Sequence, residues 1–173
     1  PGKLLMELAK ILGDGDSMAR LMFGANQLVV TMDHTRVYTA LLEGEYIKYR
    51  QIIPANWKTR MTVNREQLSL CVDRASLMAR ESKANLVKLT ISQDGVVVTS
   101  NSEMGEAYEE MEAEVEGEEL AIAFNVRYLT DVLRAVEGEQ IAMRFNSGVS
   151  PCVICPVEGD AYIYMVLPVR VNA

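Results

Sequence analysis

A single pattern occurs three times along this chain: an amphipathic helical segment followed by three short strand-like runs joined by turns. The copies open near Gly2, Asn64 and Asn125, so the period is roughly 55–65 residues. A repeat of this kind constrains the fold strongly, because a unit of one helix and three strands cannot bury its apolar face alone. The pattern predicts an α+β fold in which helices pack on antiparallel sheets.

The expected elements follow from local patterning. Leu4, Leu8 and Ile11 recur at helical spacing in the first copy, and Asn64 and Asn125 are predicted N-caps of the second and third helices. The expected strands cover residues 20–23, 27–32, 37–42, 61–63, 86–91, 96–99, 140–145, 152–154 and 161–167.

The net charge of −7 is unevenly distributed. Residues 103–119 hold nine glutamates and neither lysine nor arginine. The rest of the chain carries 15 acidic against 17 basic residues, a balance of +2. Because the acidity is concentrated in one hairpin-like stretch, part of which alternates as a half-exposed strand does, the global charge does not exclude a surface elsewhere that faces DNA.

The cysteines and the single histidine bear on catalysis. An odd number of cysteines argues against a disulfide framework and favours a reducing cytoplasm. Cys152 and Cys155 have C-x-x-C spacing, but a zinc site needs two more ligands and only Cys71 and His34 remain. Two unrelated strand cysteines are the favoured interpretation, and a thiol enzyme is an alternative. We expect no catalytic residue, metal or cofactor, since the nucleotide-binding glycine motifs are missing too.

Sparse basic residues accompany the apolar residues of each expected helix. A spacing of seven residues puts some of them on common helix faces. On an ordinary exposed face such charges are routine, whereas around a duplex they would attract phosphates weakly and without sequence preference. The candidate DNA-facing residues are Lys3, Lys10, Arg65, Arg74, Arg80, Arg127 and Arg134.

Four segments carry a resemblance to the bacterial DNA polymerase III beta subunit family, the sliding clamps. They are residues 46–54 (YIKYRQIIP), 75–81 (ASLMARE), 124–129 (FNVRYL) and 165–170 (MVLPVR). The resemblance covers essentially the whole chain. It implies a head-to-tail homodimeric ring of six similar domains, with helices lining a hole around duplex DNA and sheets forming the outer wall. Such a ring is a processivity factor that tethers the polymerase and has no catalytic activity.

The resemblance also implies how the chain is divided. Residues 1–57 would be the second half of the clamp's middle domain, and residues 58–173 the C-terminal domain. In the family two copies of the repeat form one domain, so we expect three copies to be an incomplete chain. Such a chain would not close a ring and would bind DNA weakly. Leu77 and Met78 match the C-terminal domain's share of the ring interface.

The same resemblance implies a cleft that receives short peptide motifs of the polymerase, the clamp loader and repair proteins. Leu167 and Val149 would form an apolar recess, while Arg170 and the Tyr128 hydroxyl would hold the peptide backbone or a carboxylate. Ile47 and Gln51 stand where some relatives carry Pro and Arg. A non-replicative α+β interaction module is the main alternative. The matching positions are Ile47, Gln51, Ile52, Asn125, Tyr128, Val149, Pro151, Met165, Val166, Leu167, Pro168, Val169, Arg170 and Val171.

Overall fold

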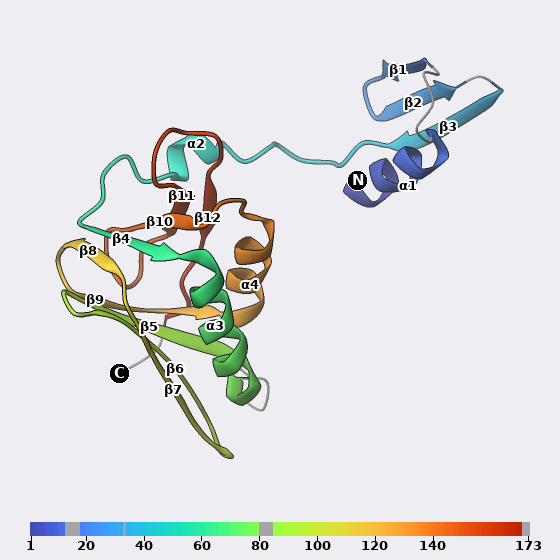
Figure 1. Cartoon of the computed structure of the whole chain (residues 1–173). Helices are drawn as coiled ribbons and strands as arrows, with labels where there is room; N and C mark the ends of the chain where they lie inside the picture. Colours follow the sequence, from blue (N-terminus) through green and yellow to red (C-terminus); the bar gives the residue numbers. More distant parts are fainter. Residues whose placement is uncertain (13–17, 33, 80–84, 171–173) are drawn as a thin grey trace. The chain divides into compact units, whose positions relative to one another are not determined.

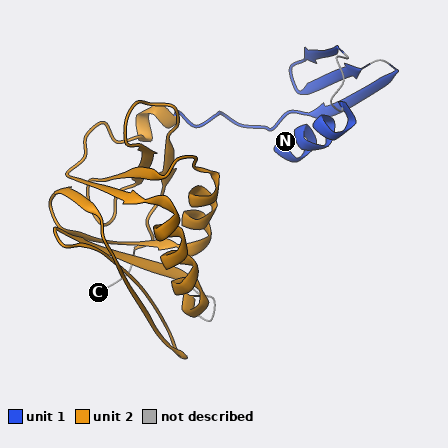
Figure 2. Ribbon diagram, viewed as in Figure 1, with its two compact units in different colours: residues 1–48 blue, residues 49–173 orange. Residues whose placement is uncertain are grey.

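The chain divides into two compact units, residues 1–48 (unit 1) and residues 49–173 (unit 2), which Figure 2 distinguishes by colour. The structure is a computed structural model that describes residues 1–12, 18–32, 34–79 and 85–170. The boundary expected from the resemblance, between residues 57 and 58, lies further along the chain than the boundary between the two units, which falls between residues 48 and 49. A short helix at Tyr49–Ile52, which was not predicted from the sequence, begins unit 2.

Unit 1 consists of one helix and one antiparallel sheet with the strand order β1-β2-β3. Its small core contains Leu8 from the helix and Leu28, Val30 and Met32 from the central strand. Phe23 and other apolar side chains of this unit stay exposed. The elements are α1 (Gly2–Leu12), β1 (Ala19–Phe23), β2 (Gln27–Met32) and β3 (Thr35–Ala40), labelled in Figure 1.

Unit 2 contains two further copies of the repeat. Its described strands form two sheets, with the orders β12-β11-β10-β4-β8 and β7-β6-β5-β9. None of the helices in the described parts of the chain is long and apolar enough to cross a membrane. The elements are α2 (Tyr49–Ile52), β4 (Thr59–Asn64), α3 (Arg65–Ala79), β5 (Leu86–Ser92), β6 (Gly95–Ser102), β7 (Gly105–Met111), β8 (Glu114–Gly117), β9 (Leu120–Asn125), α4 (Val126–Ala135), β10 (Gln140–Phe145), β11 (Cys152–Pro156) and β12 (Tyr164–Val166).

The two copies in unit 2 exchange their first strands. Strand β4, which leads into α3, pairs with β10 of the next copy along six residue pairs from Asn64↔Gln140 to Thr59↔Phe145. Strand β9, which leads into α4, pairs in the same antiparallel sense with β5 of the preceding copy. Each sheet therefore contains strands from both copies, and neither copy is complete without the other.

The predicted N-caps lie at equivalent points of this exchange. The Asn64 side chain accepts a hydrogen bond from the Gln67 amide at 3.0 Å, and the Asn125 side chain accepts one from the Arg127 amide at 3.0 Å. These bonds satisfy amides that the first turn of a helix leaves without partners, so both N-cap predictions are confirmed. The next amide after each asparagine also bonds to the partner copy: the Arg65 amide donates to the Glu139 carbonyl and the Val126 amide to the Asn85 carbonyl, each at 2.9 Å.

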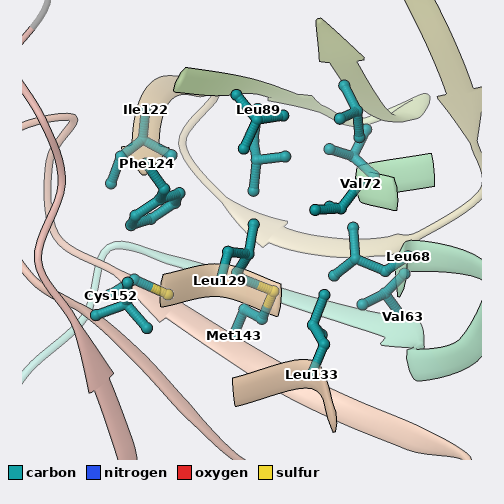
Figure 3. Close-up of a cluster of buried hydrophobic side chains, with 14 of the residues drawn as sticks. Val63, Leu68, Val72, Leu89, Ile122, Phe124, Leu129, Leu133, Met143 and Cys152 are labelled. Carbon is teal, nitrogen blue, oxygen red and sulfur yellow. The ribbon is translucent and has the colours of Figure 1, made fainter. Parts of the chain in front are cut away.

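One apolar core lies between the helices and the two sheets of unit 2. Figure 3 shows Leu129 and Leu133 of α4 beside Met143 of β10, with Leu68 and Val72 of α3 in the same cluster. The core draws on both copies of the repeat, as the apolar periodicity of the helices predicted. The two helices contact each other as well as the sheets.

The glutamate-rich stretch forms two strands that belong to different sheets, whereas the sequence predicted a hairpin-like stretch with a half-exposed strand. Strand β7 pairs with β6 in a hairpin that projects from unit 2 in Figure 1, and β8 crosses to the other sheet and pairs with β4. Gly117 ends β8 at a φ of +101°, and a Cβ there would collide with the Lys58 carbonyl oxygen. The close approach of two backbones therefore requires glycine at this position.

We expect Leu129→Ala to lower the free energy of unfolding of unit 2 by about 2–5 kcal/mol, because a fully buried side chain leaves a cavity when it is truncated. Leu70→Ala on α3 is the matched control, since Leu70 is 51% exposed, and its effect should stay within about 0.5 kcal/mol. Urea unfolding followed by circular dichroism measures both. Equal losses in the two variants would contradict the shared core described above.

Candidate functional site

The segment after β12 crosses the surface of unit 2 and is held by a backbone hydrogen bond. Val166 pairs with Cys152, so Pro151 and Leu167 leave the sheet side by side. Three residues after Val166, the Val169 amide donates to the carbonyl of Ala123 on β9 at 2.8 Å. We call residues 167–170 the tail. Leu167 is 60% exposed although its backbone lies next to the sheet, so its side chain is available for contact with another molecule.

A recess of about 290 Å³ opens between the tail and the outer face of the four-stranded sheet. Val169 of the tail and Val149 of the β10–β11 loop line it, as predicted positions of the cleft. Gly148 approaches Ala121 so closely that a Cβ would collide with the Ala121 carbonyl oxygen. Because this close approach needs glycine, the backbone itself fixes the position of Val149 at the recess. The full lining is Lys88, Ala121, Ile122, Ala123, Gly148, Val149 and Val169.

Asn125 and Tyr128 lie beyond the point where the tail meets β9. Asn125 is two residues after Ala123 on the same strand, a distance of about 7 Å. Its side-chain oxygen caps α4, which leaves its amide nitrogen as the group available for a ligand. Tyr128, in the first turn of α4, is exposed. Met165 and Val166 pair with Val153 and Cys152 in the sheet; Met165 is half-buried and Val166 buried, and their part in the cleft stays a prediction.

Three predicted cleft positions lie elsewhere in the chain. Gln51 and Ile52 are exposed on α2 of unit 2, and Ile47 is exposed in unit 1. Their participation in a common cleft stays a prediction. Val171 lies outside the described residues.

Lys88, Ala121 and Gly148 were not predicted to lie at this site. The alternation along β5 marks Lys88 as an outward-facing residue, but nothing local indicates that the tail passes beside it. That placement depends on pairing between distant segments. Only the register of the strands, Lys88 opposite Ala123, brings them together.

Two of the predicted DNA-facing residues, Arg65 and Arg74, form hydrogen bonds or ion pairs with other elements of the fold. The Arg65 guanidinium donates to the carbonyls of Gly138 and Leu133 at 3.0 and 3.3 Å, just after and within the last turn of α4. Arg74 binds Glu109 of β7 through two nitrogens, at 2.8 and 2.6 Å, which lowers the pKa of the Glu109 carboxyl. Arg65 therefore links α3 to the end of α4, and Arg74 links α3 to β7.

The remaining cations are more exposed. Lys10 pairs with Glu7 at 2.9 Å, one turn away on α1. Arg127 lies 4.0 Å from Asp131, and both side chains are mostly in solvent, where such a pair is weak. Arg134 is exposed and, with Arg127, lines a recess between α3 and α4. Lys3 is exposed on α1, and Arg80 lies outside the described residues.

Leu77 and Met78, the predicted ring-interface residues, lie near the end of α3. Leu77 is exposed, whereas Met78 is half-buried. The Met78 sulfur is close to Gly105, the first residue of β7, next to the turn of the β6–β7 hairpin. Leu77 is therefore the more available of the two for contact with another subunit.

Cys71, Cys152 and Cys155 are all buried free thiols. Burial, with a smaller effect of the neighbouring Cys155, raises the pKa of Cys152 far above its usual range. A thiol that is neutral and shielded from solvent is a poor nucleophile, which weighs against the thiol-enzyme alternative. His34 lies exposed at a turn, and no cluster of metal-binding side chains occurs within residues 1–12, 18–32, 34–79 and 85–170.

Comparisons with known proteins agree with this architecture. The beta sliding clamp of Staphylococcus aureus is 33% identical over 172 residues, which are 98% of this chain and 46% of that protein. The beta chain of DNA polymerase III from Streptococcus pneumoniae has a TM-score of 0.89 at 31% identity, covering 99% of this chain and 46% of that one. The DNA polymerase sliding clamp of Bacillus subtilis has a TM-score of 0.86 at 34% identity, with the same coverages of 99% and 46%.

The chain thus spans about half the length of the relatives it matches. A family model described as the C-terminal domain of the DNA polymerase III beta subunit matches residues 50–170, nearly the whole of unit 2. The chain therefore belongs to the DNA polymerase III beta subunit family.

Proposed function

We propose that this chain is part of a DNA sliding clamp, a cytoplasmic processivity factor that encircles duplex DNA as a ring dimer. It would dock short peptides of the polymerase, the clamp loader and repair proteins, and it would catalyse no reaction itself. Family membership supports this assignment. The observation that carries the docking role is the tail, whose hydrogen bond to β9 holds an exposed Leu167 near an apolar recess.

The chemistry of this surface suits an extended peptide. The recess offers the methyl groups of Val149, Val169 and Ala121 to an apolar anchor. Two polar side chains lie on the neighbouring segments: Asn125, two residues after Ala123 on β9, and the exposed Arg170, the residue after Val169. Apolar lining with a few polar groups at the rim is typical of sites that bind peptides and small ligands.

The helix surface suits weak attraction to a duplex. Arg127 and Arg134 lie seven residues apart on α4, and therefore on one face. Within the described residues Arg134 has no ion pair, and Arg127 has only the weak, exposed pair with Asp131 at 4.0 Å, so both remain available for phosphates. A ring holds DNA by enclosing it, and a few long-range charge contacts of this kind leave the duplex free to slide.

The docking proposal predicts that the double variant Leu167→Ala, Arg170→Ala binds a fluorescent Gln- and Leu/Phe-rich peptide at least about tenfold more weakly than the wild type. The loss has two sources, the apolar contact of Leu167 and the charge of Arg170. Wild-type affinity should lie in the ~µM range, about −8 kcal/mol. Fluorescence polarisation measures both affinities.

The control for that experiment is Leu42→Ala, Arg36→Ala, which makes the same chemical change at two exposed positions of unit 1. The control should bind as the wild type does. Wild-type protein that fails to bind, or a double variant that binds normally, would contradict docking at the tail.

The DNA proposal predicts that Arg127→Ala, Arg134→Ala reduces retention on immobilised duplex DNA at low salt. Each lost phosphate contact should reduce the slope of log affinity against log salt by about 0.9. The control Arg20→Ala, Arg36→Ala removes two exposed arginines of the unit 1 sheet and should leave the slope unchanged. Salt elution profiles give both slopes, and equal effects of the two variants would exclude a specific role for α4.

A further inference from the structure

The recess lies on the outer face of the sheet formed by β7, β6, β5 and β9. Side chains alternate along β5, so Val87 and Leu89 face the core and Lys88 faces outward. Lys88 is opposite Ala123 on β9, and directly opposed side chains lie on the same face of a sheet. Ala123 is only 5% exposed although it lies on this outer face, next to the tail that bonds to its carbonyl. Lys88 is therefore one strand away from the tail.

The floor of the recess consists of small side chains. Ala121 and Ala123 leave room above β9, and Val149 and Val169 form the walls. The volume of about 290 Å³ is at the lower end of the range for ligand pockets, enough for one apolar side chain of a peptide. This part of the site is defined by residues outside the predicted cleft positions, apart from the two valines.

Lys88 puts a positive charge at the rim of the recess. Lys88 is exposed, and no carboxylate of the described residues lies within ion-pair distance of it. The acidic strand β7 is separated from Lys88 by β6, in the row Lys88, Thr99, Tyr108. A cation beside an apolar recess attracts a ligand that carries a carboxylate next to an apolar group.

We propose that Lys88 and this recess form a specificity subsite that selects docking peptides with an acidic side chain beside the apolar anchor. The inference rests on the proposed docking function and names a chemical preference within it. Charge complementarity and continuity with the tail commit the occupant to a partner peptide with an aspartate or glutamate side chain. Because the ion pair would lie at an exposed rim, its effect should be modest, about two- to fivefold in affinity.

The test compares peptides that differ by one neutralised charge. A Gln- and Leu/Phe-rich peptide is acetylated and amidated, so that no terminal carboxylate is present, and glutamate is placed in turn at each position flanking the apolar anchor. Matched peptides carry glutamine at the same positions. Fluorescence competition then gives the glutamate-to-glutamine affinity ratio for each position, at low and at moderate salt.

We expect wild-type protein to prefer glutamate about two- to fivefold at one position, with a smaller preference at higher salt. Lys88→Gln should abolish the preference, and Lys88→Glu should reverse it. The control Arg36→Glu makes a comparable charge change on the unit 1 sheet and should retain the wild-type ratio. Ala121→Leu fills the recess and should weaken the binding of all the peptides equally.

The two possible failures are distinguishable. Wild-type protein that binds these peptides with equal affinity for glutamate and glutamine at every position would overturn the subsite and leave docking intact. A preference that survives Lys88→Glu would overturn it as well. Wild-type protein that binds none of the peptides would overturn the docking function and the subsite together.

Discussion

The exchange of first strands between the two copies of the repeat in unit 2 determines the rest of its structure. It joins β4 to β10 and β9 to β5, so each sheet is completed by the other copy. It also fixes both helix starts, because Asn64 and Asn125 end the exchanged strands and cap the helices that follow. The position of β9 then decides where the tail lies, since Ala123 accepts the hydrogen bond from Val169. The candidate docking surface is thus a consequence of the same pairing that builds the core.

The charged side chains of this chain fall into two groups, those paired within the fold and those exposed on its surface. Several of the glutamates of the acidic stretch are bound within the fold, as in the pairs Arg74–Glu109 and Arg60–Glu116. The ion pair at Arg74 connects α3 to β7, so an arginine that appears available in the sequence serves a structural role. Arg127, Arg134 and Lys88 are different: among the described residues Arg127 has only the exposed pair with Asp131 at 4.0 Å, and Arg134 and Lys88 have no carboxylate within ion-pair distance. Those three cations define the surfaces on which a nucleic acid or a peptide is proposed to bind.

Local patterns predicted much of this fold. Strand-like apolar runs identified β2 and β10 to the residue, and the two asparagines marked the starts of α3 and α4. Strand β9 was not predicted; its pairing partner β5 belongs to the other copy of the repeat, so nothing in the neighbouring sequence indicates the pairing. The last strand is shorter than predicted, since only residues 164–166 pair with β11 before the tail turns toward β9. Long-range pairing, which carries no local signal, explains these differences, and it explains the unforeseen position of Lys88 too.

The strand exchange also has a consequence for synthesis on the ribosome. Strand β4 emerges early, but its partner β10 consists of residues 140–145, which are made on the order of 4–15 s later at ordinary elongation rates. Until then α3, β5 and β6 have no complete core against which to pack. Contacts between residues so far apart in the sequence slow folding, because the intervening chain must be ordered before they form. The nascent chain therefore presents apolar strands to its surroundings for seconds, and unit 2 should acquire its structure as a whole only after β10 has been released.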